Sequence, residues 1–317
     1  MKAMLHCFAL LIAGLLCSSS LAQYPTKPVR IVTPSAAGAP NDIIARIIGP
    51  SLSEALGQPV IVDNRPGGAG VIGAEAVINS PADGYTLLMA SNTYIFMPLL
   101  RKNPPHDPAV AFVPISSIVS AAYYFIISAA IPAKTMAEFI AYARTKPGKL
   151  NYAAGSLSAT VLTETLKIHT GIDLIQIPYK GQNLAFPDLI SGRVHATFAS
   201  ASALAYVKEG KMRALAITSE RRSPLAPDIP ARDEAGLPPV SIDIFSGLLG
   251  PAGTPKEVVE RISREVNIVL RRSEIRAQIQ RVGLDPEGSS PAEFAAYLKR
   301  QHEVWRQAIK NAGIPLI

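Results

Sequence analysis

Cysteine is nearly absent from this 317-residue sequence, and its two copies, Cys7 and Cys17, both lie near the N-terminus. A chain processed beyond Cys17 has no disulfide and no thiolate metal site, so an ordinary hydrophobic core must stabilise it. Aromatic residues make up only 6% of the sequence, and its lysines and arginines are scattered. Both features exclude the basic, aromatic-rich surface that is typical of nucleic-acid binding.

Long apolar runs are also missing, with one exception at the N-terminus. Lys2 precedes an apolar run from Leu5 to Cys17, and the small-residue stretch 18–22 follows it. This pattern is typical of an export signal cleaved after Ala22, which predicts a periplasmic mature chain starting at Gln23. A membrane anchor needs about 20 consecutive apolar residues, which this run lacks. Lipid attachment at Cys17 is a weaker alternative, because bulky Leu16 precedes it.

The size and charge of the mature chain set its broad class. Removing 22 residues leaves 295, more than one core usually organises, so we expect two lobes. Removing the signal lowers the formal net charge from +7 to +6, because Lys2 is its one charged residue when histidine is counted as neutral. This modest excess favours anionic ligands weakly.

Short β-branched runs alternate with helical patterns from Val29 onward, which predicts an α/β fold with mainly parallel sheets flanked by helices. One such block starts at Val29 and a second, with its own βαβ periodicity, near Tyr124. After Phe245 the pattern becomes mainly helical. We infer that the C-terminal helices return to the first block, so the chain crosses between lobes twice.

The residues that an enzyme would need do not form recognisable patterns. The histidines beyond the signal, at positions 106, 169, 195 and 302, show no metal-ligand spacing, and no serine lies in a nucleophile-elbow motif. The stretch from Gly67 to Gly70 lacks the Lys-Ser/Thr ending of a phosphate-binding loop. We therefore expect neither catalysis nor a metal or cofactor.

Four segments, in matching order and spacing, resemble the Bug family, the substrate-binding proteins of tripartite tricarboxylate transporters. They are 34–46, 62–75 with 83–87, 177–181 and 250–255. The resemblance covers nearly all of the chain from Tyr24 to about Gly313. It implies a two-lobed periplasmic-binding-protein (Venus-flytrap) fold that captures one small carboxylate and delivers it to membrane transporter subunits.

The resemblance also suggests how the chain is divided. We expect lobe 1 to comprise 23–124 and 246–317, lobe 2 to comprise 125–245, and the protein to be a monomer. A periplasmic ligand-sensing protein that feeds a signalling partner would use the same two lobes. This second role stays open at the level of sequence.

The candidate binding residues lie in loops that lead into helix N-termini, whose free N–H groups and partial positive charge suit a carboxylate. Small residues there let a ligand approach the backbone. The candidates are Ser35, Ala36, Ala37, Gly38, Ala39, Asn41, Asp42, Ser91, Asn92, Gly155, Ser156, Leu157, Ser158, Thr160, Lys180 and Ser200.

Each candidate also has a purely structural interpretation. The serines and threonines can cap helices, Asp42 can pair with a helix dipole, and Lys180 can be solvated. Phe245 is either a core residue of a crossover or an aromatic wall of the cleft.

Three positions depart from the family's usual pattern. Ser35 replaces a frequent aromatic residue, Ala39 a second glycine, and Leu157 a glycine in a loop that is one residue shorter. These departures predict a pocket of altered shape rather than an altered fold.

Overall fold

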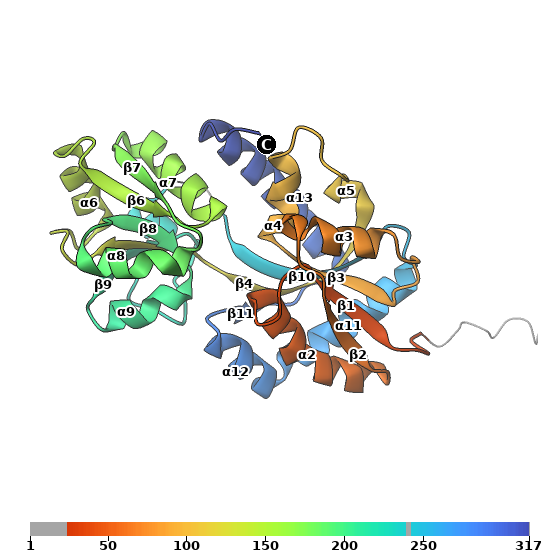
Figure 1. Cartoon of the computed structure of the whole chain (residues 1–317). Helices are drawn as coiled ribbons and strands as arrows, with labels where there is room; N and C mark the ends of the chain where they lie inside the picture. Colours follow the sequence, from red (N-terminus) through yellow and green to blue (C-terminus); the bar gives the residue numbers. More distant parts are fainter. Residues whose placement is uncertain (1–23, 239–241, 317) are drawn as a thin grey trace, which may run out of the picture.

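The computed structural model describes residues 24–238 and 242–316, so the expected signal and its cleavage site after Ala22 lie outside the described residues. Figure 1 shows two α/β lobes side by side, joined by the strands β4 and β10. Lobe 1 is built on a six-stranded sheet and lobe 2 on a five-stranded one. The two-lobed α/β fold expected from the sequence is confirmed.

The sheet of lobe 1 has the strand order β11-β4-β10-β3-β1-β2. Its strands are β1 Val29–Thr33, β2 Val60–Asn64, β3 Thr86–Ser91, β4 Phe112–Ala121, β10 Ile244–Pro251 and β11 Asp285–Pro286. Its helices are α2 Pro40–Leu56, α3 Val71–Ile78, α4 Asn92–Leu99, α5 Pro108–Ala111, α11 Lys256–Arg271, α12 Ser273–Arg281 and α13 Pro291–Asn311. The helices after β10 belong to lobe 1, as expected.

The sheet of lobe 2 has the order β7-β6-β8-β5-β9. Its strands are β5 Tyr124–Ser128, β6 Leu150–Ala154, β7 Leu174–Pro178, β8 Ala196–Ala199 and β9 Met212–Ile217. Its α-helices are α6 Met136–Arg144, α7 Leu157–Thr170, α8 Phe186–Ser191, α9 Leu204–Lys208 and α10 Arg232–Ala235. Short 3-10 turns at Gly68–Gly70, Gln182–Ala185 and Ala201–Ala203 precede α3, α8 and α9.

Both sheets are mixed, which corrects the expectation of mainly parallel sheets. The parallel pairs are β1–β2, β1–β3, β6–β7 and β6–β8, and the remaining pairs are antiparallel. The physical reason is the double crossing between lobes. Because β4 carries the chain out of lobe 1 and β10 brings it back, the two strands run in opposite directions and pair antiparallel.

Polar contacts fix both crossovers. The first passes from Ala121 to Tyr124, and Tyr123 exchanges hydrogen bonds with Thr218 at 2.9 and 3.0 Å. The second ends where the Asn92 side chain donates to the Asp243 carbonyl and accepts from the Phe245 N–H. Tyr124, expected to end lobe 1, pairs with Ala199 and Ile217 in the sheet of lobe 2.

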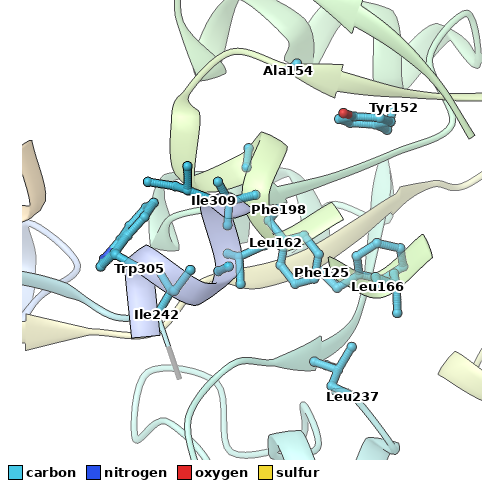
Figure 2. Close-up of a cluster of buried hydrophobic side chains, with 14 of the residues drawn as sticks. Phe125, Tyr152, Ala154, Leu162, Leu166, Phe198, Leu237, Ile242, Trp305 and Ile309 are labelled. Atoms are coloured by element: carbon cyan, nitrogen blue, oxygen red, sulfur yellow. The ribbon is translucent and has the colours of Figure 1, made fainter. Parts of the chain in front are cut away.

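The C-terminal helix α13 packs on both lobes. It lies against β4 and α4 of lobe 1 and contacts α7 of lobe 2. Figure 2 shows its Trp305 and Ile309 beside Leu162 of α7, in a cluster that also holds Phe198 and Ile242. Trp305 is fully buried. Although α13 has 21 residues, no helix in the described part of the chain is apolar over a length that crosses a bilayer.

Asp42, in the first turn of α2, holds the loop between β1 and α2 in shape. Its carboxylate accepts the Gly38 N–H at 2.8 Å, the Asn64 amide at 2.9 Å and the Arg46 guanidinium at 3.0 Å. The Asn64 amide also donates to the Ser35 carbonyl. The Arg46 guanidinium, helped by the Gly38 and Asn64 N–H groups, lowers the pKa of Asp42 to about 2 against the opposing effect of burial.

We expect Trp305→Ala to lower the free energy of unfolding by about 3–5 kcal/mol, because the indole fills the cluster that joins the lobes. Urea denaturation followed by circular dichroism measures this loss. Lys299→Ala, at an exposed position of the same helix, serves as the control and should change stability by less than about 0.5 kcal/mol. Equal losses in the two variants would show that Trp305 is not central to the core.

We expect Asp42 to make the protein acid-sensitive. Its folded-state pKa of about 2 lies below the value of about 3.9 for an unfolded chain, so its stabilising effect is present above pH 4. That effect disappears as the pH falls from about 4 to about 2. Urea midpoints at pH 6 and pH 2.5 should therefore drop further for the wild type than for Asp42→Asn. Equal drops of the urea midpoint in the two proteins would show that Asp42 does not cause the acid sensitivity.

Candidate functional site

The candidate residues gather at the carboxyl ends of the parallel strands in each lobe. In lobe 1, β1 lies between β2 and β3. The connection through α2 leads from β1 to β2 on one side, and the connection through α3 leads from β2 across β1 to β3 on the other side. Lobe 2 repeats this arrangement with β6 between β7 and β8. Such a switch of direction opens a crevice beyond the strand ends, where α/β sheets bind ligands. In Figure 1, β1 runs from the N-terminal end of the trace towards lobe 2.

The β1–α2 loop forms one part of the crevice in lobe 1. Ala36, Ala37 and Gly38 are exposed, while Ser35 and Ala39 are half-buried. The Ser35 hydroxyl oxygen is buried and has no hydrogen-bond partner within the described part of the chain. A buried hydroxyl without a partner is costly, so a ligand or water that bonds to it is favoured.

Asn41 and Asp42 have structural roles in the same loop. The Asn41 side chain donates to the Met89 carbonyl and accepts from the Ser246 hydroxyl at 2.7 Å, and the side chain is buried. Asp42 is occupied by Arg46 and the loop, as described above. The structural interpretation of Asp42 is therefore supported, because its carboxylate already has three kinds of donor.

Ser91 and Asn92 lie at the end of β3, next to the β1–α2 loop. Ser91 is the last residue of β3, and α4 begins directly with Asn92. These two residues therefore do not form a polar turn between the strand and the helix. Asn92 is buried, and its amide binds the second crossover. Phe245 is also buried, with its ring against Phe294 and Tyr297, so it is a core residue.

The loop between β6 and α7 forms part of the crevice in lobe 2. Ser156 caps α7 by accepting the Ala159 N–H at 3.2 Å, and the Thr160 hydroxyl donates back to the Ser156 carbonyl. Ser158 is buried and hydrogen-bonded to Tyr123, whose pKa burial raises to about 12. Leu157 packs against the core. What the loop offers a ligand is therefore its backbone, since the first-turn N–H groups have no intrahelical acceptor.

Gly155 permits a close approach between two loops. A Cβ atom at this position would lie 2.5 Å from the Gln182 Cα. The Gly155 N–H donates to the Gln182 side chain, whose NH₂ donates to the Thr197 hydroxyl at 2.6 Å. Any larger residue would push the 181–182 segment away from β6.

Gln182 and Asn183 lie among the candidate residues of lobe 2, and the sequence reasoning missed them. Asn183 accepts from the Ser202 hydroxyl, which contacts the Ser200 hydroxyl at 2.9 Å. These groups line the ends of β7 and β8 beside the Gly155 loop. Their position directly after Gly181, at the start of the helical segment that follows β7, is the signal that could have identified them.

The electrostatics of both crevices favour a ligand with acceptor atoms. The N-termini of α2 and α4 in lobe 1 and of α7 in lobe 2 point partial positive charge to these edges. Lys180 is exposed at the end of β7. Among the described residues, no group of three or more His, Cys, Asp or Glu side chains is placed to hold a metal ion.

The candidates of the two lobes remain two separate sets. Within the described ranges, the lobe 1 set makes no hydrogen bond or ion pair with the lobe 2 set.

Comparisons with known proteins identify the family. Residues 44–314 match the family model described as "Tripartite tricarboxylate transporter family receptor". The chain is 30% identical to Protein BugT of Bordetella pertussis over 309 residues, which cover 96% of this chain and 95% of BugT.

Solved structures agree with this match. The structure titled "R. palustris Rpa4515 with adipate" is 31% identical, with a TM-score of 0.77 over 92% of this chain and 99% of the other. MatC from Rhodopseudomonas palustris, with bound malate, is 27% identical, with a TM-score of 0.72 over 90% of this chain and all of the other. These findings confirm the resemblance found in the sequence. The chain belongs to the tripartite tricarboxylate transporter receptor family, which includes the Bug proteins: it is a periplasmic solute-binding protein and not an enzyme.

Proposed function

We propose that this protein captures a small carboxylate between its two lobes and delivers it, as a monomer, to the membrane subunits of a tripartite transporter. The observation that carries the proposal is the pair of helix-start loops, one at each strand switch point, with small residues and N–H groups at their surface. The structures of relatives that contain adipate and malate support the same ligand class.

In this proposal the ligand binds mainly to backbone N–H groups. The site side chains in lobe 2 largely hold the loops in place, and Asp42 and Asn41 do the same in lobe 1. Ser35 is the exception, because its buried hydroxyl is free to donate to a carboxylate oxygen. Gly38 and the alanines between Ser35 and Pro40 keep the approach of a ligand open.

Delivery would follow from closure of the lobes. We propose the division expected from the sequence, with lobe 1 as 23–124 and 246–317 and lobe 2 as 125–245, moved by one or two residues at each crossing. Tyr124 goes to lobe 2, because it pairs in that sheet, and Ile244 and Phe245 go to lobe 1, because β10 begins there. The two crossovers serve as the hinge. Closure around a ligand would bring both loops onto it and create a composite surface that a membrane subunit can recognise. The ligand then shifts the equilibrium from the open towards the closed state, because only in the closed state does it contact both lobes at once.

We expect carboxylates to raise the melting temperature of the purified protein. Ligands that bind only the folded state stabilise it by mass action, by about 2.7 kcal/mol at one hundred times Kd. A thermal-shift screen of mono-, di- and tricarboxylates, aromatic acids, amides and sugars measures this directly. A response to sugars or metal ions with none to acids would contradict the proposed ligand class.

We expect Ser35→Ala and Ser156→Ala to behave differently, although each removes one hydroxyl. Ser35→Ala should weaken binding by about 0.5–1.5 kcal/mol, at most about tenfold, and leave stability nearly unchanged. Ser156→Ala should mainly reduce stability, by about 1 kcal/mol, because it removes the α7 cap. Isothermal titration and urea denaturation of both variants separate the two effects.

We expect Gly155→Val to weaken carboxylate binding more than Ser35→Ala, because its side chain would displace the Gln182 segment. Lys180→Ala is the matched control in the same lobe, with an exposed side chain whose loss should change affinity little. Circular dichroism establishes that both variants are folded before titration. If Lys180→Ala abolished binding while Gly155→Val kept full affinity, recognition by backbone N–H groups would be wrong.

A further inference from the structure

A second, partly charged pocket lies at the switch point of lobe 1. It lies between α3 and the length of α4, and it reaches the carboxyl ends of β1 and β3. Pro34 and Ser91, which belong to the candidate site, form part of its wall. The pocket, called here the α3–α4 pocket, therefore adjoins the crevice proposed to bind the ligand.

The α3–α4 pocket has an apolar wall and a polar end. Val71, Leu88 and Met97 contribute apolar surface, and Arg101 and His106 contribute nitrogen atoms. Its cavity volume of about 40 Å³ exceeds the roughly 15 Å³ that one water molecule needs. The end of an elongated ligand fits this space, with the rest of the ligand remaining in the crevice.

Arg101 lacks a counter-ion. Its Nε is buried without a hydrogen-bond partner among the described residues, and its guanidinium is 3.5 Å from the Gly68 carbonyl, at the limit of a hydrogen bond. It forms no ion pair with any carboxylate in the described ranges. Because a guanidinium stays charged at all relevant pH values, an acceptor that enters the pocket removes an unfavourable arrangement.

His106 presents a second unpaired nitrogen to the same pocket. Its Nδ1 is buried and has no partner in the described part of the chain. Burial lowers the pKa of His106, so the ring is neutral near pH 7 and keeps one N–H. The ring lies edge-on to Phe112, at 6.1 Å between centroids, which fixes its plane.

The pocket as a whole is suited to an anion. None of the described residues that form its wall is acidic, although Glu75 and Asp107 lie near enough to affect the charge of His106. The positive charge of the pocket comes from the Arg101 guanidinium, two residues after the end of α4. An anionic group with two oxygens can accept from Arg101 with one and from His106 with the other. The apolar wall suits a short alkyl chain behind such a group.

We infer that Arg101 is a specificity-determining residue, which binds the second acidic group of a ligand whose first carboxylate binds the helix-start loops. His106 assists by hydrogen bonding to the same group. This inference rests on the proposed function and refines it. Ligands with two acidic ends and an apolar linker are selected over monocarboxylates of equal length.

Isothermal titration of the mature protein with paired acids tests the inference. The pairs are succinate with butanoate and adipate with hexanoate, so that each diacid differs from its monoacid by one carboxylate. The wild type should bind at least one diacid more than tenfold tighter than its monoacid. Arg101→Met should lower that diacid's affinity at least tenfold and change the monoacid's by less than threefold. Arg101→Lys should recover part of the preference, because it restores the charge without the guanidinium.

Lys102→Met removes an exposed neighbouring cation and serves as the matched control, with no expected effect on either acid. An unchanged diacid affinity in Arg101→Met would show that the pocket holds only water and overturn the inference. An equal loss for both acids would overturn it too, because Arg101 would then act on the shared carboxylate or on the fold. If the wild type bound no acid of any kind, the proposed function itself would fail, which is a separate result.

Discussion

The antiparallel pairing of β4 with β10 is the interaction on which the rest of the structure depends. These two strands are the only covalent links between the lobes within the described ranges, and they pair from Phe112 to Ala121. Asn92 binds the backbone of the returning strand, and the Trp305 cluster covers the junction. The two ligand loops are therefore placed relative to each other by a hydrogen-bonded ribbon and a buried apolar contact.

A division of roles between side chains and backbone follows at the site. The polar side chains that the sequence offers, such as Asp42, Asn41 and Ser156, mostly bind other parts of the protein and fix the loops. Their rigidity leaves backbone N–H groups in a defined arrangement at the ends of helices. In the proposed function, an anionic ligand meets preorganised donors, at little cost in side-chain entropy on binding.

The α3–α4 pocket adds a charged side chain to this arrangement. In the proposed function, the N–H groups of the loops recognise a carboxylate in general, since every small acid presents the same oxygens. Arg101, which has no counter-ion among the described residues and lies beside an apolar wall, is inferred to distinguish what stands at the far end of the ligand. The two proposals thus assign general recognition to the helix-start loops of both lobes and discrimination to the α3–α4 pocket of lobe 1.

The sequence by itself determined the α/β class, the two lobes and the family, and it indicated the loops that carry the candidate site. These features are local, because hydrophobic periodicity and small-residue loops before helices depend on residues close together in the chain. The tertiary structure decided the mixed sheets, because β4, with its Pro114 and serines, is recognisable as a strand only through its pairing with β10.

The tertiary structure also decided which polar side chains have hydrogen-bond partners within the protein. Asn92 and Ser158 look like ligand groups in the sequence, but they bind Phe245 and Tyr123, which are 153 and 35 positions away along the chain. Arg101 and His106 show no motif in the sequence, and only packing leaves their nitrogens unpaired in one pocket, because a hydrogen-bond partner is a property of space and not of sequence order.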